Sequence, residues 1–314
     1  PSTDVFEILQ TREQQSTKMP SITTALVGSA VISIGIGIWL LQGIQTNDDV
    51  EILAHRGAAG KAPENTMAAI RQAISDGADW VEIDVQETSD GEIIVIHDSD
   101  FMKLAGVNLK VWEGSLEEIR KIDIGSWFNA EFSNERVPTL NEILEEARGK
   151  ARVVIELKYY GHDQQLEQRV VDIVEQSGMI DTTAIMSLKQ DGIQKVRSLR
   201  PEWNIGLLSA TAIGNLSTLD VDFLAVNSSM ATTSFVRAAH SVGNQVLVWT
   251  INDRLSMSRY ISLGVDGIIT DEPELARTVL AERAQLSSVE RLLLHATIIL
   301  DQPLPKKGYR DQSP

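Results

Sequence analysis

Side chains that could perform chemistry recur at or near the ends of short apolar runs rich in valine and isoleucine. They are His55, Arg56, Glu82, Asp84, His97, Glu156, Lys158 and Trp249. Glu82 and Asp84 are two residues apart, so both side chains point to the same face of a strand. Glu156 and Lys158 repeat this spacing. If the runs are parallel strands of a barrel, these side chains gather at its carboxyl-terminal face, where such barrels have their active sites.

The three carboxylates in this set predict a metal site. Glu82, Asp84 and Glu156 lie among apolar residues, where carboxylates repel one another and lose hydration unless a cation lies between them. An all-oxygen set of ligands suits a hard divalent ion, Mg²⁺ or Ca²⁺, more than Zn²⁺. The chain has no cysteine, which excludes a thiolate metal site, a disulfide framework and a cysteine nucleophile.

The cationic and imidazole side chains would complete a phosphoryl-transfer site. Arg56 could hold a phosphate through a bidentate fork, and Lys158 could act as a point charge. His55 and His97 could form an acid–base pair, because imidazole titrates near neutral pH. Structural alternatives exist: a lone histidine is often a hydrogen-bonded structural group, Glu156 and Lys158 could be a simple ion pair, and a single tryptophan could fill the core. The shared location at one end of the strands favours the functional interpretation.

The segments that position these residues alternate between strand and helix. The expected strands are Glu51–His55, Trp80–Val85, Ile93–His97, Arg152–Leu157, Thr183–Met186, Asn204–Leu208, Phe223–Val226, Gln245–Thr250 and Gly267–Thr270. Amphipathic helices lie between them, and several end at a glycine, namely Gly77, Gly178, Gly243 and Gly264. This alternation predicts a parallel sheet covered by helices, either a closed barrel or a doubly wound sheet. The chain lacks the dinucleotide-binding glycine fingerprint, which favours the barrel.

One long stretch interrupts the alternation. Between His97 and a helix expected to start near Thr139, no clear strand is found. The stretch carries Phe101, Leu104, Trp112, Trp127, Phe128 and Phe132. It could be a substrate lid or wall, or a small packed subdomain that contacts no ligand.

An ordered set of short motifs resembles the glycerophosphodiester phosphodiesterase family. The motifs are His55-Arg56-Gly57, Pro63-Glu64-Asn65-Thr66, Glu82-Ile83-Asp84, His97-Asp98 and Glu156-Leu157-Lys158. The resemblance covers about residues 51–281. It implies a TIM-type (β/α)8 barrel at residues 50–284, with the insertion of the family after the second strand region, at about residues 98–138.

The same resemblance implies a role for each candidate residue. It assigns the divalent metal to Glu82, Asp84 and Glu156, acid–base catalysis to His55 and His97, the phosphate to Arg56 and Lys158, and the glycerol or leaving-group side to Trp249. The expected reaction is metal-dependent hydrolysis of a glycerophosphodiester to sn-glycerol 3-phosphate and an alcohol. Lys103 lies where an arginine is common in the family. This departure from the family pattern affects the expected fine contacts with the substrate, not the expected chemistry.

A segment ahead of the expected barrel predicts a transmembrane helix. Residues 19–47 contain no charged side chain, and an apolar helix of about 20 residues spans the hydrocarbon core of a bilayer. We expect the helix at residues 21–45, after a flank at 1–20. Arg12 and Lys18 precede it and acidic residues follow it, so the positive-inside rule places the catalytic domain outside the cytoplasm, at the cell membrane. With this segment, the chain resembles membrane-anchored bacterial members of the family.

Charge and composition limit the remaining possibilities. The formal net charge of −16 argues against a nucleic-acid partner and against electrostatic docking on anionic lipid. Residues 285–314 form a tail with no assigned role. Two alternatives to the expected activity are a lysophospholipase D-like hydrolase that acts on lipid headgroups, and a catalytically silent, membrane-anchored binding barrel. The intact set of charged residues argues against the silent barrel, because clustered charge without a ligand is costly.

Overall fold

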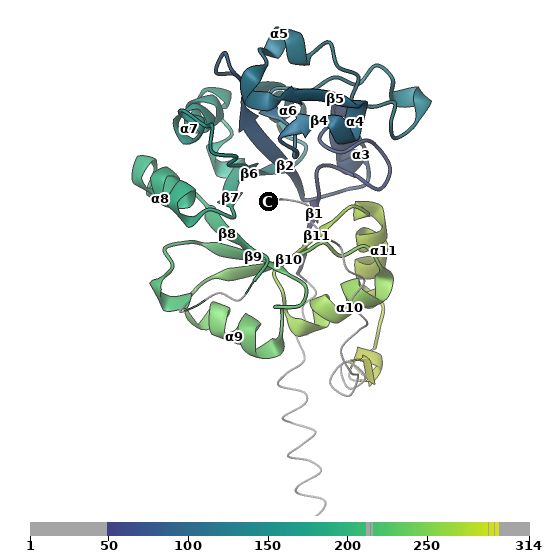
Figure 1. Ribbon diagram of the computed structural model, residues 1–314. Coiled ribbons are helices and arrows are strands. Elements are labelled where there is room, and N and C mark those ends of the chain that lie inside the picture. Colours follow the sequence, from purple (N-terminus) through teal and green to yellow (C-terminus); the bar gives the residue numbers. More distant parts are fainter. Residues whose placement is uncertain (1–48, 212–213, 215, 288, 292, 295–314) are drawn as a thin grey trace, which may run out of the picture. The chain divides into compact units, whose positions relative to one another are not determined.

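Eight parallel strands close into a barrel in the computed structural model (Figure 1). The structure describes residues 49–211, 214, 216–287, 289–291, 293 and 294. The strands are β1 (Glu51–Ala54), β2 (Trp80–Glu87), β6 (Arg152–Leu157), β7 (Thr183–Ser187), β8 (Ile205–Ser209), β9 (Phe223–Asn227), β10 (Gln245–Trp249) and β11 (Gly267–Thr270). They pair in this order, and β11 pairs with β1 to close the ring. The predicted TIM-type barrel is therefore confirmed, and the doubly wound sheet is excluded.

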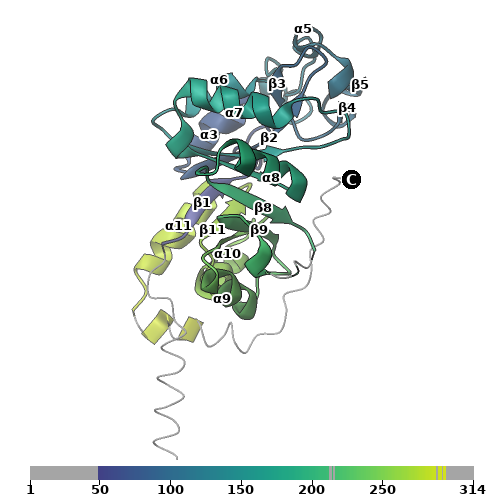
Figure 2. The same ribbon diagram turned by 90° about the vertical axis from the view of Figure 1, so that its left-hand side faces the viewer.

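Helices cover the outside of the barrel (Figures 1 and 2). They are α3 (Met67–Ser75), α6 (Leu140–Ala147), α7 (Leu166–Ser177), α8 (Gln190–Leu199), α9 (Thr233–Ser241), α10 (Arg254–Leu263) and α11 (Pro273–Ala284). Thr66 and Thr139 cap the first turns of α3 and α6 with their hydroxyl oxygens. Gly178 and Gly264 cap α7 and α10 in the left-handed conformation, as the sequence predicts. In the described part of the β8–β9 connection, a 3-10 turn (Leu216–Thr218) takes the place of a helix.

Apolar side chains fill both sides of the sheet. Inside the barrel, Leu53, Val154, Ala184 and Ala225 belong to one buried cluster that also includes Trp249. Two larger clusters lie between the strands and the surrounding helices. The strands are consequently buried on both faces, which explains why they appear in the sequence as nearly continuous apolar runs.

The expected strand Ile93–His97 is not a barrel strand, and this part of the prediction was wrong. β3 (Ile93–Val95) pairs antiparallel with the far end of β2, after a tight turn that includes Gly91 at φ 84°. A run of three β-branched residues fits either strand direction, so composition alone did not reveal the reversal. His97 therefore reaches the barrel mouth from the insertion, not from the end of a barrel strand.

The insertion between β3 and α6 is a small subdomain with regular structure. It contains α4 (Met102–Ala105), α5 (Leu116–Ile119) and a two-stranded sheet of β4 (Asp100–Phe101) and β5 (Val107–Lys110), although the sequence showed no clear strand here. Its own core consists of Ile94, Ile96, Phe101, Leu104, Val111, Ile119, Ile124 and Val137. The stretch therefore forms a packed subdomain, but of its aromatic side chains only Phe101 belongs to this core.

The predicted transmembrane helix at residues 21–45 lies outside the described residues, as do the flank at 1–20 and residues 295–314 of the tail. Among the residues that the structure does describe, none of the helices is long and apolar enough to cross a membrane.

Candidate active site

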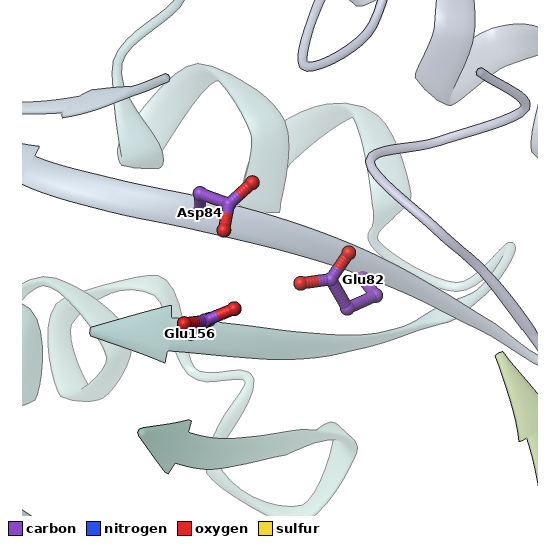
Figure 3. A group of neighbouring side chains, drawn as sticks. All are labelled: Glu82, Asp84 and Glu156. Atoms are coloured by element: carbon purple, nitrogen blue, oxygen red, sulfur yellow. The ribbon is translucent and has the colours of Figure 1, made fainter. Parts of the chain in front are cut away.

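Three carboxylates converge on the carboxyl-terminal side of neighbouring strands β2 and β6 (Figure 3). Glu82 and Asp84 lie on one face of β2, and Glu156 lies on β6 in register with Asp84. One oxygen from each carboxylate falls within 4.8 Å of the other two. All three side chains are buried. The structure thus brings together the three predicted metal ligands.

Burial and mutual repulsion separate the pKa values of these carboxylates. Burial, together with the charges of Asp84 and Glu156, raises the pKa of Glu82 well above its usual range. Burial likewise raises the pKa of Glu156 to about 7, although Lys158 opposes this effect. Burial also acts on Asp84, but the charges of His97, Lys158 and Arg56 hold its pKa well below its usual range.

The donor set fits a hard divalent cation. The neighbouring cationic side chains offset the cost of burying a negative charge for only one of the three carboxylates, Asp84. The pKa values of Glu82 and Glu156 remain raised. A further positive charge at this point would let both of them ionise. All three candidate donors are oxygens, which matches the ligand preference of Mg²⁺ and Ca²⁺.

Arg56 and Lys158, the two predicted phosphate-binding residues, contact the acidic group. Lys158 Nζ lies 3.1 Å from Glu156 Oε1 and 3.7 Å from Asp84 Oδ1. Arg56 Nε lies 3.4 Å from Asp84 Oδ2, and Arg56 Nη1 donates to Glu64 Oε1 at 3.1 Å. The backbone N–H of Arg56 also donates to Glu82 Oε2 at 2.8 Å. Arg56 has φ 50°, an uncommon conformation for a residue other than glycine, and such conformations concentrate at functional sites.

Each predicted catalytic histidine is hydrogen-bonded to an aspartate through Nδ1. His55 Nδ1 lies 2.7 Å from Asp271 Oδ1, and His97 Nδ1 lies 2.7 Å from Asp98 Oδ1. The hydrogen bond from His97 lowers the pKa of Asp98. Burial acts in the opposite direction on Asp271, but its contact with His55 still lowers its pKa. An ionised aspartate accepts a hydrogen bond from Nδ1–H, which fixes the tautomer of the ring and leaves Nε2 as the nitrogen that can exchange a proton.

Trp249 lies inside the barrel near the carboxyl end of β10, and its side chain is buried. Its indole N–H donates to the carbonyl of Ala225 at 3.1 Å, and its peptide bond with Thr250 is cis. Trp249 therefore belongs to the wall of the barrel mouth, with its orientation fixed by a hydrogen bond to β9.

A groove of about 770 Å³ lies between the loops that follow β6 and β7. Its charged and aromatic lining residues are Tyr159, Tyr160, Asp163, Lys189, Asp191 and Lys195. Tyr160 connects this groove to the segment that carries His97, because its hydroxyl donates to the carbonyl of His97 at 2.8 Å. Sequence reasoning did not identify the groove, since its residues come from two loops without a motif.

Four further residues support the predicted set, and no role was predicted for them. Asn65 donates from Nδ2 to Asp84 Oδ2 at 2.9 Å and has φ 57°. Glu64 contacts Arg56, while Asp98 and Asp271 hold the two histidines. Glu64, Asn65 and Asp98 were visible as members of the motifs. The contact of Asp271 with His55 could not be predicted from local sequence, because the two residues are 216 positions apart.

Comparisons with known proteins confirm the family suggested by the motifs. The model of the glycerophosphoryl diester phosphodiesterase family matches residues 55–275. A putative glycerophosphodiester phosphodiesterase of Bacillus subtilis is 32% identical over 71% of this chain and 95% of its own length. A glycerophosphodiester phosphodiesterase of Caldanaerobacter subterraneus is 33% identical over 71% of this chain and 94% of its own length.

Solved structures give the same result. A phosphodiesterase of Oleispira antarctica, in complex with the product sn-glycerol-3-phosphate, superposes with a TM-score of 0.70 at 27% identity, over 74% of this chain and 96% of its own. A glycerophosphodiester phosphodiesterase of Agrobacterium tumefaciens superposes with a TM-score of 0.65 at 31% identity, over 72% and 99% of the two chains. This chain is thus a phosphoric diester hydrolase by descent, and it belongs to the glycerophosphodiester phosphodiesterase family.

Proposed function

We propose that this protein hydrolyses glycerophosphodiesters to sn-glycerol 3-phosphate and an alcohol, with a divalent cation, Mg²⁺ or Ca²⁺, held by Glu82, Asp84 and Glu156. The observation that carries the proposal is the convergence of these buried carboxylates beside two cationic side chains and two aspartate-bound histidines. The Oleispira antarctica structure, solved with the product sn-glycerol-3-phosphate, supports the same substrate class.

The cationic side chains bind and orient the phosphodiester. Arg56 and Lys158 lie on either side of Asp84, so both can approach the phosphoryl oxygens of a substrate at this point. Their positive charge stabilises the negative charge that builds up during phosphoryl transfer. When bound, the divalent cation would supply Lewis-acid polarisation of a phosphoryl oxygen. Trp249 lines the wall on the glycerol or leaving-group side.

The two histidines divide the proton transfers between them. With Nδ1 bound to Asp271, His55 has its basic nitrogen at Nε2 and accepts the proton of the attacking hydroxyl. That hydroxyl belongs to water or to the substrate's own glycerol. His97 donates a proton to the departing alcohol, and Asp98 stabilises its protonated form. In this scheme, both aspartates orient the imidazole rings and remain ionised.

Release of glycerol 3-phosphate by the full chain tests this proposal. We expect release from glycerophosphocholine to stop with EDTA and to return with Mg²⁺ or Ca²⁺. His97→Ala should lower kcat by about 10²–10⁴, whereas His240→Ala, at an exposed histidine on α9, should leave it unchanged. A folded, metal-loaded protein with no activity on glycerophosphocholine, glycerophosphoethanolamine or glycerophosphoglycerol would support the silent barrel instead.

We also propose that residues 21–45 anchor the enzyme in the cell membrane, with the barrel outside the cytoplasm. The support is the long uncharged apolar segment and the basic residues before it. Because the chain has no cysteine, single cysteines report topology without background. In intact cells, an impermeant maleimide should label Ser126→Cys on the insertion but not Ser2→Cys. Release of the chain from membranes by alkaline carbonate would contradict the anchor.

A further inference from the structure

The side chain of Gln86 holds the segment that carries His97. Gln86 lies on β2 two residues after Asp84, so its side chain points to the same face of the strand as Asp84. Its Nε2 donates to three successive carbonyls, those of Ile96, His97 and Asp98, at 3.0, 3.0 and 2.8 Å. Gln86 is buried. An amide nitrogen carries two hydrogens, so at least one of them is shared between two carbonyls.

These three hydrogen bonds define the path of the chain around His97. In an extended strand, successive carbonyls point in alternate directions, whereas those of Ile96, His97 and Asp98 all reach one nitrogen. The chain therefore curls around the end of the Gln86 side chain. Asp98 Oδ1 lies 2.7 Å from His97 Nδ1, so the same turn carries both the imidazole and the carboxylate that orients it.

A second donor reaches this turn from the loop after β6. The hydroxyl of Tyr160 donates to the carbonyl of His97 at 2.8 Å, so that carbonyl accepts two hydrogen bonds. In the insertion, the Trp112 ring lies 6.3 Å from the ring of Tyr160 and stacks on His162 at 4.1 Å. These aromatic contacts between the insertion and the loop keep Tyr160 within reach of the turn.

His97 needs such support more than His55 does. His55 directly follows β1, which is paired with β11 on one side and with β2 on the other. His97 follows β3, and among the strands that the structure describes β3 pairs with β2 alone. A group that transfers a proton must lie within hydrogen-bond reach of the reacting atom, and a displacement of about 1 Å can cost about 10²-fold in rate.

We propose that Gln86 is a positioning residue that, together with Tyr160, places the His97 imidazole for proton transfer to the departing alcohol. This inference rests on the proposed function, because it assigns that proton transfer to His97. Gln86 acts only through His97. Three carbonyls already share the two hydrogens of its amide, so no hydrogen is left for the substrate.

Gln86→Met tests the inference, because methionine is unbranched and of similar length but has no N–H donor. With glycerophosphocholine and saturating Mg²⁺, kcat should fall by about 10²-fold. KM should change little, because Arg56 and Lys158 remain to bind the phosphate. The p-nitrophenyl ester of glycerol 3-phosphate releases an anion that needs no proton, so its kcat should fall by at most about threefold.

Two further variants give a graded effect and a matched control. Tyr160→Phe keeps the ring and removes one donor to the His97 carbonyl, so kcat for glycerophosphocholine should fall by about fivefold. Gln72→Met makes the same substitution on α3, where Gln72 Nε2 donates to Asp76 at 2.7 Å. This control should leave kcat unchanged for both substrates.

A double-mutant cycle separates positioning of His97 from damage to the nearby metal ligands. Gln86→Met should have little further effect on kcat when it is added to His97→Ala. An equal fall in the wild type and in His97→Ala would overturn the proposal. So would a variant Gln86→Met that lowers kcat equally for both substrates while His97→Ala discriminates between them.

A spectroscopic measurement distinguishes failure of this inference from failure of the proposed activity. In the full chain with isotope-labelled histidine, the proton on His97 Nδ1 gives the NMR signal that His97→Ala lacks. Gln86→Met should shift or broaden this signal and leave that of His55 unchanged. If the signal changes but the wild type releases no glycerol 3-phosphate, the positioning of His97 stands and the proposed activity fails. An unchanged His97 signal in Gln86→Met overturns the inference whatever the activity.

Discussion

The acidic group should make the metal-free protein less stable as the pH rises from 5 to 8. Burial raises the pKa of Glu156 from 4.5 to about 7. As the pH rises above 4.5, the unfolded chain therefore loses this proton before the folded chain does. Unfolding becomes steadily more favourable until the pH exceeds about 7, where both states are ionised. This is the opposite of the usual carboxylate, whose pKa is lowered by folding.

The size of the effect follows from the pKa shift. A difference of about 2.5 pKa units between the folded and unfolded states corresponds to about 3 kcal/mol at full ionisation. Glu82 contributes in the same direction, because its pKa is also raised. The pKa of Asp84 is lowered, so Asp84 stabilises the folded state when ionised. This stabilisation is lost only at acidic pH, below the interval from pH 5 to 8. A loss of about 3 kcal/mol is a large part of the 5–15 kcal/mol by which domains are typically stable.

Urea unfolding in EDTA at pH 5 and pH 8 measures this directly. From pH 5 to pH 8, the free energy of unfolding should fall by about 3 kcal/mol more in the wild type than in Glu156→Gln, because glutamine cannot ionise at this position. Glu145→Gln, at an exposed glutamate of α6, should behave as the wild type. Saturating Mg²⁺ or Ca²⁺ at pH 8 should reverse the loss in the wild type by mass action. If the free energy of unfolding changes equally with pH in the wild type and Glu156→Gln, Glu156 does not have the raised pKa inferred from its burial.

Three further substitutions test other parts of the site and the insertion. Asp271→Asn removes the carboxylate bound to His55 Nδ1 and should lower kcat for glycerophosphocholine by about 10²–10⁴ without changing the circular dichroism spectrum; an unchanged kcat would remove His55 from the proposed acid–base pair. Glu64→Gln removes the carboxylate that contacts both Arg56 and Lys103, so kcat/KM should fall by about tenfold. A fall confined to kcat would contradict a role of Glu64 in phosphate binding. Phe101→Ala creates a cavity in the core of the insertion and should cost about 3–5 kcal/mol in urea unfolding; a cost below about 1 kcal/mol would mean that the insertion unfolds separately from the barrel.

Much of the barrel was predictable because its strands are buried on both faces. All residues of β2 are buried, so Glu82 and Asp84 stand out as charged residues within an apolar run. Their spacing of two placed them on one face without any knowledge of the partner strand. The third candidate ligand, Glu156, was recognisable for the same reason.

The reversal at β3 was missed, although the sequence contained a signal for it. Asp90 and Gly91 lie between β2 and β3, and an Asp-Gly pair between two apolar runs favours a tight turn between antiparallel strands. Glu87 pairs with Ile93 across this turn. The regular alternation elsewhere made a parallel strand the natural interpretation. Contacts such as that of His55 with Asp271 lie beyond any local pattern, because they depend on how the barrel closes.

Strand register determines the relative positions of His55, Asp271 and two of the three candidate metal ligands. Ala54 pairs with Thr270 where β1 meets β11, so the residues that follow, His55 and Asp271, emerge side by side at the barrel mouth. Asp84 pairs with Glu156 where β2 meets β6, which aligns two of the three candidate metal ligands. A shift of one residue in either pairing would turn these side chains to the opposite face of the sheet. The closed barrel prevents such shifts, because each strand is fixed on both sides by its neighbours. The contacts that stabilise the fold therefore also hold His55 and the candidate metal ligands in place.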